Sequence, residues 1–173
     1  MHHKEYGLSL LELLIVISIV AIMVMLGAPS VIEMQRQYKL KGAVEVTYFA
    51  LQLARSGAIS ASTDTTVQFV EGENWCIGTS AGGLCDCNVL NSCTVNGVEQ
   101  LVKAADFSQI TMQDLAFGAN DAAVFDGVRG LAEGNAGSVV LTDGNNEARL
   151  VLSNLGRVRI CMQQGQLGAY DPC

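Results

Sequence analysis

The chain has 173 residues, which is enough for one domain and a short appendage, and half of them are apolar. Apolar residues are too plentiful for an intrinsically disordered chain. Lysine and arginine number 10 against 17 acidic residues, so the net charge of −7 excludes a generally basic nucleic-acid-binding surface, although a local basic patch is compatible with it.

The first predicted element is a long apolar helix. Residues 8–32 contain one ionisable side chain, Glu12, and as a helix they would span about 37 Å. This length exceeds the ~30 Å hydrocarbon core of a bilayer, and a soluble domain of this size rarely buries such a helix on all sides. The segment therefore predicts a membrane helix rather than a buried core helix.

The residues before this helix differ from a secretory signal peptide. The apolar run is longer than the usual 7 to about 15 residues, and no A-x-A-like cleavage site follows it. Lys4 and the initiator amine place the N-terminus in the cytoplasm, so the rest of the chain would lie where disulfides form. Glu12 needs a partner in its apolar surroundings. After cleavage behind Gly7, the amine of Leu8 in a neighbouring copy would supply one.

A recognisable pattern surrounds the start of the helix. Gly7, followed by Leu8-Ser9-Leu10-Leu11-Glu12 and the apolar run, resembles the prepilin signature of type IV pilins and type II secretion pseudopilins. The resemblance implies cleavage between Gly7 and Leu8 by prepilin peptidase, methylation of the new amine, and an assembly role for Glu12. Pro29 falls where the family commonly has a helix-kinking proline, whereas Leu8 departs from the preferred phenylalanine.

Beyond Pro29 the pattern predicts an amphipathic helix that continues to about Ser60. A kink or a melted turn is expected near Gly27 and Pro29, because proline lacks the N–H that a regular helix needs. The apolar positions follow helical spacing and are expected to cover a sheet: Val44, Tyr48, Leu51, Ala54 and Ala58.

Six strands with glycine-rich turns are predicted after this helix, at 66–70, 74–78, 122–126, 138–142, 148–153 and 156–162. Residues 79–97 show no strand pattern and contain three cysteines, which indicates a loop held by covalent bonds. The predicted fold class is α+β and pilin-like: a long N-terminal helix packed on an antiparallel β-sheet head that disulfides stabilise.

Several later segments resemble one pilin subgroup, the FimT/FimU minor pilins and the GspH pseudopilins. These are L-x-x-A-R-S-x-A-I at 51–59, W-x-x-G at 75–78, Phe125-Asp126-Gly127, and the closing segment 153–159. The resemblance covers most of the chain and is weakest over residues 79–120.

The resemblance implies three parts of the chain. Residues 1–7 would be a cleaved leader, 8–32 a transmembrane and filament-core helix, and 33–173 a periplasmic or extracellular head that includes the amphipathic helix 33–60. The protein would sit in the inner membrane with its head in the periplasm and then enter a pilus or pseudopilus. Its partners would be other pilins, prepilin peptidase and the inner-membrane assembly platform.

The cysteines allow many disulfide pairings, and the sequence does not choose among them. Cys85 and Cys87 are too close for an easy mutual bond, whereas Cys161 and Cys173 bracket the C-terminal tail and are a reasonable pair. A metal site at Cys85, Cys87 and Cys93 is disfavoured, because paired C-x-x-C motifs and a nearby histidine are lacking. The disulfide candidates are Cys76, Cys85, Cys87, Cys93, Cys161 and Cys173.

No catalytic pattern stands out. The two histidines, His2 and His3, lie in the predicted leader, so the mature chain would lack histidine-based nucleophile systems and histidine metal ligands. The sequence contains neither H-E-x-x-H nor a P-loop, and Gly82-Gly83 does not follow a strand in a βαβ unit. We expect neither an enzyme nor a bound cofactor or metal.

Charge is distributed unevenly along the chain. Residues 64–147 contain 12 acidic and two basic residues, whereas the next 14 residues contain Arg149, Arg157 and Arg159 and no acid. Arg157 and Arg159 would project from one face of a strand, where two guanidinium groups could grip phosphates. Gly156-Arg157-Val158-Arg159 also resembles the G-R-x-R motif of FimT-type pilins, which bind DNA for natural transformation. The default alternative is that these arginines pair with acids such as Glu147 or solubilise an edge strand.

The sequence thus predicts a minor pilin of a type IV pilus that acts in filament assembly, with DNA uptake as a possible second role. Two alternatives stay open. One is a GspH-like pseudopilin of the type II secretion system, and the other is a single-pass membrane protein that forms no filament. A mature N-terminus at Leu8 distinguishes the pilins from the last alternative.

Overall fold

The computed structural model of the protein describes residues 9–168 and 170–173. Two compact units divide between Gln35 and Arg36, within the single long helix α1 (Leu10–Ala61). The first unit is the N-terminal part of α1, and the second is a head built from the rest of α1 and the β-strands.

Every described side chain from Ser9 to Gly27 is exposed. The large apolar side chains between Leu10 and Leu26 are 48–80% exposed. Helical structure continues through Gly27 and Pro29, so the prediction of a melted turn there is wrong. A proline removes only one hydrogen bond of the ladder, and the helix-forming residues on both sides maintain the helix.

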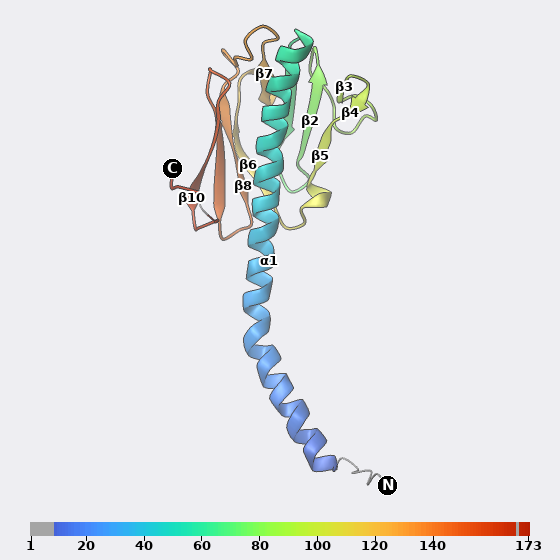
Figure 1. The fold of residues 1–173 in the computed structure, drawn as a ribbon, viewed down its shortest axis with the longest axis vertical. Helices are drawn as coiled ribbons and strands as arrows, with labels where there is room; N and C mark the ends of the chain where they lie inside the picture. Colours follow the sequence, from blue (N-terminus) through green and yellow to red (C-terminus); the bar gives the residue numbers. More distant parts are fainter. Residues whose placement is uncertain (1–8, 169) are drawn as a thin grey trace, which may run out of the picture. The chain divides into compact units, whose positions relative to one another are not determined.

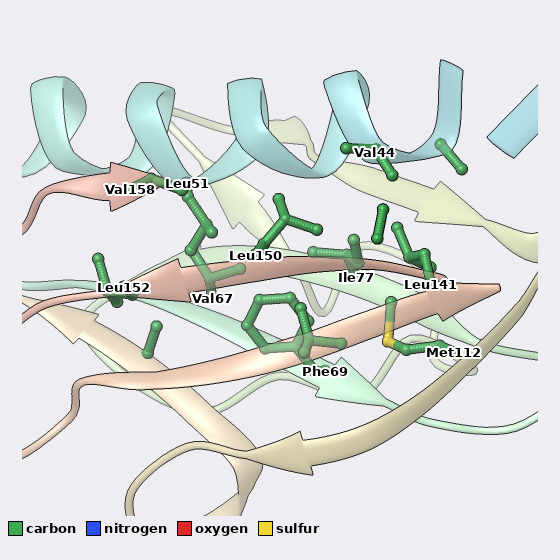
Figure 2. Close-up of a cluster of buried hydrophobic side chains, with 14 of the residues drawn as sticks. Val44, Leu51, Val67, Phe69, Ile77, Met112, Leu141, Leu150, Leu152 and Val158 are labelled. Atoms are coloured by element: carbon green, nitrogen blue, oxygen red, sulfur yellow. The ribbon is translucent and has the colours of Figure 1, made fainter. Parts of the chain in front are cut away.

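In the head, α1 lays one face on the β-strands. Figure 2 shows Val44 and Leu51 pointing from the helix toward the sheet residues Val67 and Leu150. Tyr48 lies half-buried at the margin of this face, so the predicted helical stripe is confirmed. The fully or almost fully buried residues follow spacings of three and four: Leu40, Ala43, Val44, Thr47, Leu51, Ala54 and Ala58.

Two four-stranded antiparallel sheets and a small ribbon complete the head (Figure 1). The first sheet has the order β5-β2-β1-β7 and consists of β1 (Thr65–Val70), β2 (Cys76–Ala81), β5 (Leu101–Lys103) and β7 (Ala122–Phe125). The second has the order β10-β9-β8-β6 and consists of β6 (Thr111–Ala116), β8 (Gly137–Thr142), β9 (Glu147–Leu152) and β10 (Val158–Gln164). The ribbon pairs β3 (Thr94–Val95) with β4 (Val98–Glu99), and 3-10 helices cover Ala104–Asp106 and Ala119–Asp121.

The α+β, pilin-like fold class is confirmed, and the predicted sheet proves to be two sheets. All six predicted strands exist with shifted ends, but residues 79–97 are not free of strand. β2 continues to Ala81, and β3 begins at Thr94. β6 was missed because a bulge between Gln113 and Ala116, with Asp114 at a φ of 51°, interrupts its alternation.

The core lies between α1 and the inner faces of both sheets (Figure 2). Phe69 is stacked on Phe117 with ring centroids 4.6 Å apart. Trp75 packs against Phe107, and its indole N–H donates to the carbonyl of Ile110 at 2.8 Å. Each such buried side chain contributes about 1.5–3 kcal/mol. The head therefore has a core of its own, to which residues 10–35 add nothing.

Candidate functional site

Glu12 lies in the first turn of α1, among exposed apolar side chains. Its backbone N–H donates to the hydroxyl of Ser9 at 3.2 Å, which is the arrangement of a helix N-cap. The Glu12 side chain is exposed, so its carboxylate is accessible to a cationic group on another molecule. Gly7 and Leu8, between which we predict cleavage, lie outside the described residues.

The N-terminal part of α1 is suited to an apolar environment. Among the described residues, α1 is the one helix long and apolar enough to cross a membrane, with a mean hydropathy of 2.8 in a window that is 0% buried. Its hydroxyl groups are satisfied within the helix, since Ser18 and Ser30 donate to the carbonyls of Leu14 and Gly27 at 2.7 and 2.9 Å. A bilayer or a bundle of helices would therefore accept this segment without unpaired hydroxyls.

The β9–β10 hairpin positions the three arginines. The N–H of Ser153 donates to the carbonyl of Arg157 at 3.0 Å, and the N–H of Arg157 donates to the Ser153 hydroxyl at 3.2 Å. Arg149 lies opposite Cys161 in the register, two residues beyond Arg159. Alternation with the buried Val158 therefore places all three arginines on the outer face of the second sheet.

The ion pairs expected for these arginines are absent. Arg157 and Arg159 are exposed, and Glu147 accepts a hydrogen bond from the side-chain amide of Gln113 at 3.2 Å instead. Among residues 9–168 and 170–173, the ion pair within 4 Å is Lys41–Glu45. Arg149 is half-buried, and its Nε atom has no hydrogen-bond partner.

Three segments that carry the pilin resemblance meet at the C-terminal end of α1. The Nε of Arg55 donates to the carbonyl of Gly130 at 3.0 Å. Gly156 lies so close to both residues that a Cβ would collide with the Gly130 carbonyl. Gly127 packs on the backbone of Thr63 in the same way. These residues fix the end of the helix to the loops and serve the fold.

Asp126 organises the loop that follows β7. Its carboxylate accepts the backbone N–H groups of Arg129 and Leu131, both at 2.7 Å, and of Val128 at 3.0 Å. These bonds, that from Arg129 above all, hold the pKa of Asp126 below its usual range. The carboxylate is therefore occupied by structural bonds.

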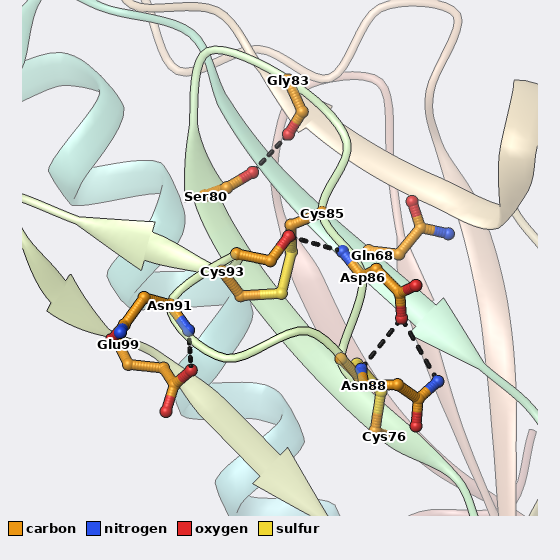
Figure 3. The surroundings of a disulfide bond; sticks show 12 residues. Gln68, Cys76, Ser80, Gly83, Cys85, Asp86, Asn88, Asn91, Cys93 and Glu99 are labelled. Atoms are coloured by element: carbon orange, nitrogen blue, oxygen red, sulfur yellow. Dashed lines mark hydrogen bonds between the residues drawn. A yellow bond between two sulfur atoms is a disulfide. The ribbon is translucent and has the colours of Figure 1, made fainter.

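All six cysteines are paired, as Cys76–Cys87, Cys85–Cys93 and Cys161–Cys173. Cys85 and Cys87 thus have different partners, and the third bond joins the two cysteines that bracket the tail. The first two bonds hold the loop after β2, as Figure 3 shows. In the described part of the chain, no group of three or more histidine, cysteine or acidic side chains is arranged to hold a metal ion.

The sequence did not reveal how the C-terminal tail is fixed. Leu167 is 3% exposed and reaches the core, and the Tyr170 hydroxyl donates to the carboxylate of Glu45 on α1 at 3.4 Å. Burial, and then the charge of Glu45, raise the pKa of Tyr170. The only available signal was an isolated leucine and tyrosine in a polar tail that ends in cysteine.

Comparison with known families identifies this arrangement. Residues 43–156, more than half of the chain, match the family model described as type II transport protein GspH. The chain belongs to the GspH family. Residues 2–28 match the prokaryotic N-terminal methylation motif, a range that includes Gly7 and Glu12. No curated protein and no solved structure matches the chain.

The two matches show that this GspH-family chain is a pilin or pseudopilin. The family is structural rather than enzymatic, and its members assemble with other pilins into a filament. Together with the apolar N-terminal part of α1, the methylation motif indicates anchoring in a membrane.

Proposed function

We propose that the protein is a minor pilin of a type IV pilus. Residues 1–7 are removed by prepilin peptidase, and the amine of Leu8 is methylated. The helix over 8–32 holds the chain in the inner membrane, with the head, 33–173, in the periplasm. The assembly platform then draws this helix into the filament core. The main support is an apolar helix segment that is exposed throughout, joined to a head with a complete core.

Glu12 directs this assembly in the proposal. Its carboxylate is exposed at the start of the apolar helix, where a charge costs about 3 kcal/mol in a bilayer. The Leu8 amine of a neighbouring subunit relieves that cost, because opposite charges attract strongly in apolar surroundings. The pair would set the axial register between subunits.

A Glu12→Ala variant tests this role. It should accumulate in the membrane at the wild-type level, because the helix becomes more apolar, but be largely absent from sheared filaments. Immunoblots of membrane and filament fractions measure both quantities. Glu33→Ala, which removes a carboxylate beyond the apolar segment, serves as the control. Incorporation of Glu12→Ala at the wild-type level contradicts the role.

A pseudopilus subunit of the type II secretion system is the second candidate, and the family description favours it. The exposed arginines of the G-R-V-R segment favour the pilus instead, since they resemble FimT-type pilins. Deletion of the gene separates the two candidates. Loss of surface pili with normal protein secretion supports the pilus, and loss of secretion with normal pili supports the pseudopilus.

DNA binding is a further role that we propose for the head. Arg157 and Arg159 are exposed on one sheet face and have no acidic partner within 4 Å in the described structure. Two phosphate contacts would give a slope of about −2 for log K against log salt concentration. Binding would therefore be weak and lost at high salt, since the rest of the head is acidic.

Gel-shift measurements at about 50 mM salt test this role. The head from Arg36 onward should shift duplex DNA, and Arg157→Gln with Arg159→Gln should abolish the shift. Arg129→Gln removes an exposed arginine from another loop and should leave binding nearly unchanged. The absence of a shift by the wild-type head defeats the proposal.

A further inference from the structure

The head has an uncharged groove between α1 and the strands of the first sheet. Its volume is about 560 Å³. The outer side of α1, β2, β5 and the β3–β4 ribbon line it, and none of these described lining residues is charged. Leu53 and Val98 stand at the groove 61% and 59% exposed, and Gly57 leaves space beside the helix.

Next to this groove, the disulfide-bonded loop presents an apolar knob, which we define as Leu84, Val89 and Leu90. These side chains are 56%, 54% and 81% exposed. Residues 87–92 at its tip carry no charge. Large apolar side chains gathered on an exposed loop are typical of a contact surface.

The knob is held in a fixed shape. The disulfides Cys76–Cys87 and Cys85–Cys93 cross the loop, and the carboxylate of Asp86 accepts the backbone N–H of Asn88 at 2.9 Å (Figure 3). The N–H of Asn91 donates to the carboxylate of Glu99 at 2.7 Å. A loop ordered in advance loses little conformational entropy when it binds.

The knob and the groove share the β3–β4 ribbon. Glu99 on β4 bonds the loop, and the N–H of Gln100 donates to the carbonyl of Cys93 at 2.8 Å. Val95 and Val98 of the same ribbon line the groove. Because the two surfaces are neighbours, a two-fold axis would allow each of two heads to insert its knob into the groove of the other.

We propose that the knob of one head docks in the groove of a second copy of this chain. The charge distribution supports a second copy as the occupant. Residues 64–147 are strongly acidic, so two heads repel each other over most of their surface, whereas the knob tip and the groove are uncharged. Three knob side chains form a contact below the size of a stable interface. It therefore rests on the proposed function for the membrane anchoring that concentrates the heads.

Photo-crosslinking of the full chain in its own membrane tests this contact. Benzoylphenylalanine replaces Leu90, and mass spectrometry identifies the joined peptides. We expect a crosslinked dimer in which position 90 of one copy is joined to the peptide that contains Leu53 or Val98 of the other. Benzoylphenylalanine at Val128, which is 83% exposed on another loop, should give no crosslink to the groove. Absence of the dimer, crosslinks outside the groove, or crosslinks only to other proteins overturn the proposal.

A charge-reversal pair provides a second measurement. Leu90→Glu and Leu53→Lys should each reduce co-purification of two differently tagged copies by about tenfold, which equals about 1.4 kcal/mol. A Leu90→Glu copy combined with a Leu53→Lys copy should recover most of the loss. Failure to recover contradicts the contact. Filament incorporation measured on the same strains keeps the two proposals apart, since normal incorporation without the dimer overturns only the docking.

Discussion

At the scale of single residues, Asp126 shows how one side chain stabilises a loop. Its two carboxylate oxygens accept three backbone N–H groups, which leaves no hydrogen-bonding role for an amide in its place. Asp126→Asn would turn an NH₂ group toward one of these donors, because an amide has only one acceptor oxygen. We expect a lower Tm for this variant at pH 7.

The pH dependence of this effect follows from the lowered pKa. A carboxylate whose pKa is lower in the folded state stabilises the fold above its ordinary pKa, and this stabilisation is lost as the pH falls through the folded-state value. The difference in Tm between wild type and Asp126→Asn should therefore shrink below about pH 4. Thermal melts across this range measure it, with Glu133→Gln in the same loop as the control. A difference that is constant with pH contradicts the assignment.

Gly78, the last residue of the W-x-x-G segment, lies against a disulfide. A Cβ at this position would collide with the sulfur of Cys93 and approach that of Cys85. Gly78→Ala should lower the free energy of unfolding by about 1–3 kcal/mol, because the packed core has no room for the methyl group. Urea denaturation measures the change. Gly83→Ala, with no atom within 4 Å of the new Cβ, should have little effect, and equal effects of the two variants would contradict this account.

At the scale of elements, the predictable parts are those with a regular period. The buried stripe of α1 was readable because Val44, Leu51 and Ala58 follow helical spacing. β3, β4 and β5 are two or three residues long, too short for any alternation to appear. The groove that they line and the pairing of the loop cysteines were consequently not visible in the sequence.

The C-terminal tail is an element held by one disulfide, a buried leucine and one side-chain hydrogen bond. Replacing Cys161 and Cys173 together by serine should lower the free energy of unfolding by about 2–4 kcal/mol, since a closed loop restricts the unfolded chain. It should also make residues 163–168 sensitive to protease. Tyr170→Phe removes only the bond to Glu45 and should have a smaller effect on both readouts. A protease-resistant tail in the double variant contradicts this description.

At the scale of the whole molecule, composition was informative only after it was divided along the chain. The high apolar fraction is concentrated in the N-terminal part of α1, and the acidic residues are concentrated in the head. The prepilin pattern around Gly7 and Glu12 could be read from the sequence because it lies at a fixed distance before an apolar run. The position of Arg157 and Arg159 without acidic partners needed the structure, because ion pairing depends on neighbouring strands.

The central claim is that the chain is processed after Gly7 and enters a filament by its N-terminal helix. The most direct test is the N-terminal sequence and mass of the protein recovered from membranes and from sheared filaments. The account predicts a chain that begins at Leu8 with a methylated amine in both fractions. A chain that still begins at Met1, or that is found in membranes and never in filaments, would contradict it.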